Sequence, residues 1–221
     1  MFIKKTITDQ ICDILRQKII HLDFKPGERI SIDQLNKEFN VSRAPVRDAL
    51  RRLEQENLVL VKPQIGTFIS PISLQKAFEI SQIRLLLEPY AAEVAANNIG
   101  FKDQEIITQK FDQLGKIEGN FTQKRQCLND ADTLLHKTIW KLSGNEEICA
   151  ILEGYRDQIN RIRLTTARLT HRLESSEKEV KEIYHALMEK DPKRTREAMY
   201  THLSKLKNSI KKMVDLQKNK A

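Results

Sequence analysis

Hydrophobic and polar positions near the front of the chain alternate with the period of an α-helix. In residues 8–21, Ile11, Leu15 and Ile19 recur every four positions, and Ile14 is expected on the same inner side. This pattern predicts an amphipathic helix that buries one face. The Pro-Gly pair in FKPGERIS then predicts a turn, because proline and glycine interrupt regular structure.

Two further helices are expected after this turn. Ser31 precedes the segment IDQLNKEF, and Gln34 within that segment stands three positions after Ser31. This spacing is a capping box, which marks the start of a helix. The tripeptide NVS leads into a longer helix over about residues 43–56. Its apolar stripe consists of Val46, Ala49, Leu50 and Leu53. Two short helices joined by so tight a turn predict a helix-turn-helix.

The longer of these two helices has cap residues at both ends. Ser42 is expected to be the N-cap, with its hydroxyl accepting a hydrogen bond from an N–H group of the first turn. Pro45 falls in that first turn, where a missing N–H costs little. Asn57 follows the helix and tolerates the left-handed conformation of a C-terminal cap.

The hydrophobic period changes after Asn57. The segments LVLVK and GTFIS are rich in β-branched and aromatic residues, and PQIG supplies a proline and a glycine between them. This arrangement predicts a β-hairpin, which forms a small wing with Gly66 at its tip. Residues 1–70 are therefore expected to form a winged helix-turn-helix domain.

The rest of the chain shows a helical period and no convincing strand. After the linker SPIS, the segment LQKAFEISQIRLLLEPYAAEVAANN predicts a long helix that is bent or restarted near Pro89. Asn145 and the pair Asp191-Pro192 are helix start signals. The later helices are expected at about 103–120, 122–142, 145–170, 175–190 and 192–215. A second domain over residues 74–215 is therefore predicted to be an all-α bundle, and the fold class is mainly α.

Positive charge is concentrated on the third predicted helix. At about 100° per residue, Arg43, Arg47 and Arg51 form a line beside the apolar stripe, whereas Arg52 points elsewhere. A short helix with one buried edge and a row of guanidinium groups suits a DNA major groove. The alternatives are a solvated surface helix with scattered charge and, for Arg52, an ion pair with a carboxylate of its own helix.

The composition narrows the class of protein. Of 221 residues, 40% are hydrophobic and 31% are charged, which is typical of a soluble globular protein. The formal net charge of +8 favours a polyanionic partner, although six lysines from Lys205 onward supply much of it. No apolar run approaches the ~20 residues of a membrane span, and the N-terminus lacks the apolar core of a signal peptide. Three scattered cysteines indicate a reducing compartment, so a cytoplasmic location is expected.

The segment PGERISIDQLNKEFNVSRAPVRDALRRLEQENLVLVKPQIGTFIS resembles the winged helix-turn-helix of the GntR family of bacterial transcription regulators. The Pro-Gly turn, the VSR-x-PVR-x-ALRRLE core and the wing glycine carry the resemblance. The family usually has glycine where this chain has Asn57, and both residues suit a C-cap. The resemblance implies base contacts by Arg43 and Arg47. The other expected DNA-binding residues are Ser42, Ala44, Pro45, Arg51, Arg52 and Gly66.

The second half is similar to the FadR-type branch of the same family, whose effector domain is called FCD. IRLLLEPYAAEVAA resembles the first long helix of that domain, DTLLHKTIWKLSGN its Asp-x-x-x-His segment, and AMYTHL its closing His-Leu. The resemblance implies a homodimeric repressor or activator. Such a protein binds a pseudo-palindromic operator and responds to a small metabolite held in the helical domain.

The same resemblance implies a metal site made by Asp132, His136 and two later histidines. Asp132 and His136 are four residues apart on a predicted helix, so both side chains can face one point. His202 matches the last histidine of the family pattern. Val180 stands where the other histidine is expected, and a valine side chain cannot coordinate a metal ion.

Two other histidines are poorly placed to supply the missing ligand. His185 is expected on another face of its helix, and His171 lies in or near a predicted turn. Two interpretations follow. In the first, a zinc or nickel site with one protein ligand fewer holds a small carboxylate effector at its open coordination positions. In the second, the site is metal-free and its histidines donate hydrogen bonds to that effector.

Arg84 is the one charge in the apolar segment ISQIRLLLEP. It either reaches the surface or pairs with Glu88, or it binds a carboxylate or phosphate of the effector. A metal-dependent enzyme centred on Asp132, His136 and His202 is an alternative to the regulator, and an architectural nucleic-acid binder is another. The chain contains no P-loop, Gly-x-Ser-x-Gly or His-Glu-x-x-His motif that would indicate catalysis.

Overall fold

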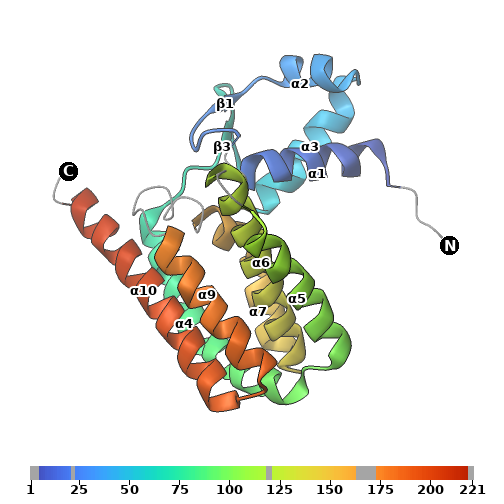
Figure 1. The fold of residues 1–221 in the computed structure, drawn as a ribbon. Helices are drawn as coiled ribbons and strands as arrows, with labels where there is room; N and C mark the ends of the chain where they lie inside the picture. Colours follow the sequence, from blue (N-terminus) through green and yellow to red (C-terminus); the bar gives the residue numbers. More distant parts are fainter. Residues whose placement is uncertain (1–4, 21–22, 118–120, 163–172, 219–221) are drawn as a thin grey trace. The chain divides into compact units, whose positions relative to one another are not determined.

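The computed structural model describes residues 5–20, 23–117, 121–162 and 173–218 (Figure 1). The chain divides into two compact units, Met1–Ser73 and Leu74–Ala221. In its described residues the first unit combines helices with a small antiparallel sheet, and the second unit is helical. The predicted fold class, a winged helix-turn-helix followed by an all-α bundle, is confirmed.

The helices of the first unit are α1 (Ile7–Ile20), α2 (Ile32–Phe39) and α3 (Arg43–Gln55). Ser31 begins α2 as predicted, because its hydroxyl oxygen accepts a hydrogen bond from the Gln34 backbone N–H at 3.3 Å. In α1, the expectation for Ile14 is wrong: its side chain is 44% exposed. Cys12 is buried in its place, next to Ile11.

The caps of α3 differ from expectation at one end only. Ser42 occupies the N-cap position but its side chain makes no capping hydrogen bond. Pro45 is the third helical residue and has no N–H, so one of the two donors that an N-cap hydroxyl usually reaches is missing. At the other end Asn57 adopts the left-handed conformation, with φ of 59°, and the Leu58 N–H bonds to the Leu53 carbonyl at 2.9 Å.

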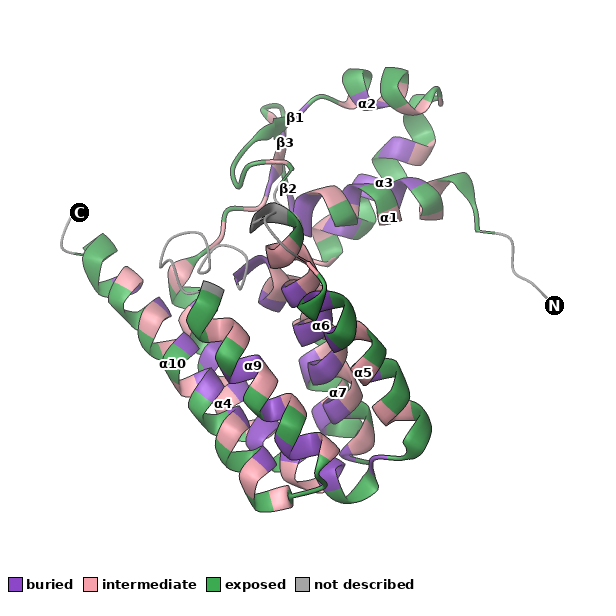
Figure 2. Ribbon diagram, viewed as in Figure 1, coloured by how far each residue is buried: buried purple, intermediate pink, exposed green. Residues whose placement is uncertain are grey.

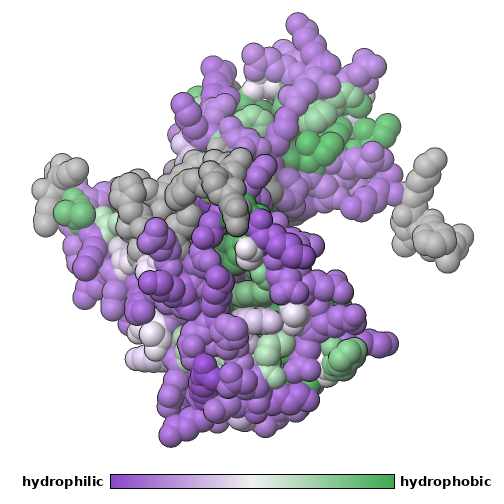
Figure 3. Space-filling model, in the orientation of Figure 1, coloured by the Kyte–Doolittle hydropathy of each residue, from purple (hydrophilic) through white to green (hydrophobic). Residues whose placement is uncertain are grey.

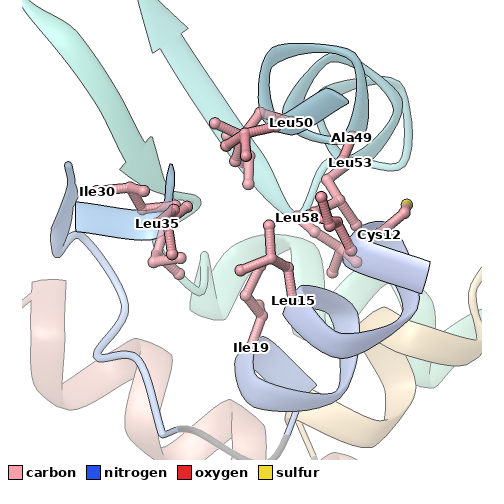
Figure 4. Packing of buried hydrophobic residues seen from close by; sticks show 13 residues of the cluster. Cys12, Leu15, Ile19, Ile30, Leu35, Ala49, Leu50, Leu53 and Leu58 are labelled. Atoms are coloured by element: carbon pink, nitrogen blue, oxygen red, sulfur yellow. The ribbon is translucent and has the colours of Figure 1, made fainter. Parts of the chain in front are cut away.

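One hydrophobic core holds the first unit together (Figure 4). All three helices contribute to it, and so does the sheet through Ile30, Val59 and Ile69. Leu15 and Leu53 are fully buried. Since burying a leucine side chain stabilises a fold by about 1.5–3 kcal/mol, this core determines the orientation of α3 against α1.

The sheet has three strands, β1 (Arg29–Ile30), β2 (Val59–Lys62) and β3 (Gly66–Ile69), in the order β1-β3-β2. Both pairings are antiparallel, with Val59 opposite Ile69 and Lys62 opposite Gly66 in the predicted hairpin. The sequence did not predict β1. A strand of two residues is too short to show a period, and it directly follows the turn signal of FKPG.

The second unit is a bundle of mostly long helices. Its labelled helices are α4 (Leu74–Asn98), α5 (Phe101–Gly115), α6 (Phe121–Leu142), α7 (Glu146–Gly154), α9 (Leu173–Met188) and α10 (Pro192–Lys218). Helix α4 packs along α10 and also contacts α6 and α9 (Figure 1). The buried faces of these helices point into the bundle (Figure 2), and the outer surface in view is mostly hydrophilic (Figure 3).

Several helix boundaries in the second unit depart from the expected ones. Helix α4 continues through Pro89 without a break. The helix expected at 145–170 ends at Gly154, and the chain is helical again over 156–162. Residues 163–172 lie outside the described part of the chain. Among the described residues, no helix is both long and apolar enough to cross a membrane.

Candidate functional site

The exposed face of α3 carries the predicted DNA-binding arginines. Arg47 and Arg51 are exposed and, within the part of the chain that the structure describes, neither makes an ion pair. Arg43 pairs with Asp33 of α2 at 2.8 Å, but both side chains are about two-thirds exposed. Such a surface pair contributes only about 0–1 kcal/mol, so Arg43 can exchange Asp33 for another anion.

Arg52 is bound differently from the other three arginines. It does not pair with a carboxylate of α3, as one interpretation suggested, but with Asp9 of α1. The pKa of Asp9 is lowered to about 2, first by hydrogen bonds from Thr6 and then by the one from Arg52. A second pair joins the same two elements, because Arg16 of α1 holds Glu56 at 2.6 Å. Arg52 therefore links α3 to α1, and its guanidinium group is already engaged.

The entrance to α3 is open to solvent. Ser42 and Ala44 are exposed and Pro45 is half-buried. The Ser42 hydroxyl makes no capping hydrogen bond to the helix.

The wing tip is shaped by a glycine and an arginine. Gly66 begins β3 with φ of 143°, a backbone conformation that other residues rarely adopt. Arg29 of β1 donates a hydrogen bond to the Ile65 carbonyl at 2.9 Å, and its Nε would lie 2.9 Å from a Cβ atom at position 66. The glycine thus allows both the turn and the close approach of Arg29.

Gly66→Ala is expected to disorder the wing. An alanine in this conformation costs about 1–3 kcal/mol, and its methyl group would also displace Arg29. We expect faster amide hydrogen exchange across β2 and β3 together with weaker DNA binding. Gly115→Ala, at a position with free space around it and no positive φ, is the control. Equal exchange rates in the two variants would contradict a special role for Gly66.

Three predicted metal ligands come together inside the second unit. Asp132 and His136 on α6 and His202 on α10 each offer a ligand atom, and these atoms lie within 4.8 Å of one another. All three residues are at most 3% exposed. The His136 Nε2 atom is 3.2 Å from Asp132 Oδ1.

The chemistry of this cluster fits a divalent cation. The Nε2 atoms of His136 and His202 are buried, and neither has a hydrogen-bond partner among the described residues. Burial lowers the pKa of His202 to about 4, although its hydrogen bond to Glu179 raises it, so the imidazole is neutral near pH 7. Neutral imidazole and carboxylate are ligands for zinc and nickel.

A layer of buried partners surrounds the cluster. Arg84 pairs with Glu88, its neighbour one turn along α4, as one interpretation of the sequence expected. The Glu88 carboxylate also contacts His136 Nδ1 and accepts a hydrogen bond from Trp140 Nε1 at 3.0 Å. Burial raises the pKa of Glu88, but the positive charge of Arg84 and the hydrogen bonds from His136 and Arg84 lower it, so the pKa stays below its ordinary value.

The sequence did not reveal two members of this layer. The helical spacing indicates Glu88 only as a partner of Arg84, and no sequence pattern indicates its contact with His136. Glu179 of α9 contacts His202 Nδ1 at 3.1 Å, 23 residues away along the chain. Spacing on a single helix could have indicated the Arg84–Glu88 pair, whereas the contacts between different helices have no local signal.

Among the described residues, no histidine outside the cluster completes it. Val180 is fully buried in α9, and His185 is exposed on the same helix, on another face as the spacing predicted. His171 lies outside the described residues. The described residues therefore offer three of the four ligands that the family resemblance implies.

Comparison with known families gives an independent view of both units. The model of the bacterial regulatory proteins of the gntR family matches residues 7–69, and that of the FCD domain matches residues 79–205. The chain belongs to the GntR family. It is a DNA-binding transcription regulator of the branch that carries a C-terminal FCD effector-binding domain.

Individual relatives agree with this assignment. The chain is 27% identical over 195 residues to the HTH-type regulator YdhC of Bacillus subtilis, covering 88% of this chain and 87% of YdhC. It is 26% identical over 215 residues to the transcriptional repressor RspR of Escherichia coli, covering 94% and 90%. The solved structure of E. coli McbR/YncC shares the fold, with a TM-score of 0.75, 20% identity and coverage of 96% and 100%. The alternative of a metal-dependent enzyme finds no support among these GntR-family regulators.

Proposed function

We propose that a small carboxylate controls DNA binding by this GntR-family protein through a divalent zinc or nickel ion at Asp132, His136 and His202. The observation that carries the proposal is the convergence of one carboxylate and two imidazole rings, all buried, each of which offers a ligand atom within 4.8 Å of the others. With three protein ligands, coordination positions stay open for the effector. The cation would bind the carboxylate as a Lewis acid and compensate its charge after desolvation.

Arg84 is proposed as a second group that senses the effector. One of its guanidinium nitrogens lies 3.3 Å from His136 Nδ1, so it contributes positive charge beside the cluster. Its pairing with Glu88 makes it a rigid part of the site. Without a cation, His136 and His202 would instead donate hydrogen bonds to the effector carboxylate.

The DNA-binding surface is proposed to consist of the α3 entrance, the arginine line and the wing tip. Arg47 and Arg51 are the arginines best placed to reach bases, because no acidic partner among the described residues holds them. Arg43 joins them when it releases Asp33. Ser42, Ala44 and Pro45 would meet phosphates and base edges, and Gly66 would approach the minor groove. Arg52 is the least available of the predicted residues.

We expect the protein to be a homodimer, because a lone recognition helix reads only a few base pairs and specific sites usually combine two half-sites. Light scattering at micromolar concentration should give twice the mass of 25.7 kDa. A mass of one chain both with and without operator DNA would contradict this expectation.

The function is tested with metal-stripped protein and a duplex that the protein selects from a random pool. Fluorescence anisotropy is measured without additions, with zinc or nickel, and with a panel of small carboxylates in the presence of each metal. We expect metal and carboxylate together to change operator affinity at least tenfold. The same additions should have no such effect on His202→Ala. Equal responses of the two proteins would overturn the proposal.

Val180→His tests whether the fourth ligand position of the family is retained. If residue 180 faces the cluster, the new imidazole completes a four-ligand set, and zinc or nickel affinity should rise at least tenfold in calorimetry. His185→Ala is the control, because His185 is exposed on the same helix. Unchanged affinity in a folded Val180→His protein would show that position 180 does not face Asp132 and His136.

A further inference from the structure

In both histidines of the buried cluster, the Nδ1 atom contacts a carboxylate that lies outside the cluster. His136 Nδ1 contacts Glu88 of α4, and His202 Nδ1 contacts Oε2 of Glu179 on α9 at 3.1 Å. An ionised carboxylate only accepts hydrogen bonds, so each contact requires the proton to be on Nδ1. Arg84 also approaches His136 Nδ1 at 3.3 Å, but the nearer Glu88 carboxylate decides the tautomer.

In a neutral ring, the other nitrogen of each histidine then carries a lone pair. With the proton on Nδ1, the Nε2 atom of a neutral imidazole is an acceptor and a metal ligand. His136 Nε2 lies 3.2 Å from Oδ1 of Asp132, whose carboxylate is also an electron-pair donor, and one ring nitrogen of each histidine lies within 4.8 Å of the other ligand atoms of the cluster. In the opposite tautomer, His136 could donate to Asp132 at 3.2 Å, but Glu88 would face a lone pair.

We infer that Glu88 and Glu179 are positioning residues that hold both histidines in the Nδ1–H tautomer, so that the cluster presents lone pairs to a cation. This inference rests on the proposed cation site and deepens it. Carboxylates that bind the second nitrogen of a ligating histidine are a general means of orienting the ring and raising its basicity. Here they would prepare a site to which the described residues contribute three ligands.

The two carboxylates differ in how firmly they are held. Glu88 is fully buried and has Arg84, His136 and Trp140 as partners. Glu179 borders a groove of about 390 Å³ between α9 and α10, where Lys205 lies 3.4 Å from its second oxygen. Since Glu179 is bordered by this groove, it is the one that can be replaced with the smaller risk to folding.

The first test reads the tautomers directly in metal-free protein. With ¹⁵N-labelled histidine, two-bond proton–nitrogen NMR spectra distinguish Nδ1–H from Nε2–H rings. We expect His136 and His202 in the Nδ1–H form, and we expect Glu179→Leu to shift His202 alone toward the Nε2–H form. Glu182→Leu, which removes an exposed carboxylate from the same helix, should change neither ring.

The second test measures zinc binding by calorimetry. Removal of such a partner typically weakens metal binding 10- to 100-fold, and we expect that loss for Glu179→Leu. Glu179→Gln, which keeps an acceptor oxygen, should lose less, and Glu182→Leu should bind like the parent protein. Circular dichroism confirms that each variant is folded.

The two tests separate the inference from the proposed function. If the parent protein binds no zinc while both rings are in the Nδ1–H form, the cation site fails and the positioning role of the carboxylates stands. If either ring of the parent is in the Nε2–H form, the inference is overturned. It is also overturned if a folded Glu179→Leu protein keeps both the His202 tautomer and the zinc affinity of the parent.

Discussion

Glu88→Gln is expected to lower the free energy of unfolding of the helical unit by about 3–5 kcal/mol, the usual cost of removing one partner from a buried ion pair. The Glu88 side chain is fully buried and that of Arg84 is 4% exposed, so water cannot replace the lost charge. Glutamine keeps the size of the side chain, so the loss reflects the uncompensated guanidinium group and not a cavity.

Urea unfolding followed by fluorescence is a suitable measurement. Trp140 is the only tryptophan of the chain, and it is buried in the helical unit, so its emission reports on that unit and not on the DNA-binding unit. Glu93→Gln is the matched control, because Glu93 lies on the same helix in an exposed pair with Arg196. The control should cost less than about 1 kcal/mol.

A double variant identifies the cause of the loss. Arg84→Met combined with Glu88→Gln removes both charges, and it should recover part of the stability that Glu88→Gln alone loses, because no buried charge of the pair is left unpaired. If Glu88→Gln and Glu93→Gln lowered the free energy of unfolding by the same small amount, the prediction would be contradicted, because water would then have to solvate the Arg84–Glu88 pair.

Arg47→Ala is expected to weaken operator binding by about 1–3 kcal/mol if the side chain reads a guanine edge. The physical reason is its exposure on α3 without an acidic partner among the described residues, so the guanidinium group can make two hydrogen bonds to one base. Anisotropy titrations at several salt concentrations, on the selected duplex and on random DNA, measure the effect.

Arg52→Ala is the comparison for this prediction. It removes the same charge from the same helix, but Arg52 is engaged with Asp9, so its loss should reduce operator affinity less than that of Arg47. Equal losses for Arg47→Ala on operator and random duplexes would assign Arg47 to a phosphate and not to a base. A larger loss of operator affinity for Arg52→Ala than for Arg47→Ala would contradict the inference that Arg52, which is paired with Asp9, contributes less to DNA binding than Arg47.

The first unit shows how far local patterns reach. The recurrence of Leu15 and Ile19 predicted α1, and the capping pattern at Ser31 predicted α2, because helix periodicity and caps depend on residues a few positions apart. Strand β1 exists only because Ile30 and Arg29 pair with β3 nearly 40 residues later. No short window of sequence contains that information.

Charged side chains show the same division between local and distant information. The pair of Arg84 with Glu88 lies within one helical turn and was among the interpretations of the sequence. The partner of Arg52 was not, since Asp9 is on another helix that only the hydrophobic core brings alongside. Which of several carboxylates a long charged side chain pairs with therefore depends on packing.

The sequence by itself determined the class of fold, the order of most of its elements and the residue types at both candidate sites. It could do so because periodicity, turn signals and the resemblance to a family are properties of neighbouring residues. Only the tertiary structure decided which of these groups meet. It joined Glu88 of α4 to His136 of α6 and Glu179 of α9 to His202 of α10, because the packing of buried helix faces places distant carboxylates against the Nδ1 atoms. Those contacts between helices orient the two imidazole rings, and the ring orientation decides where the buried cluster presents its lone pairs.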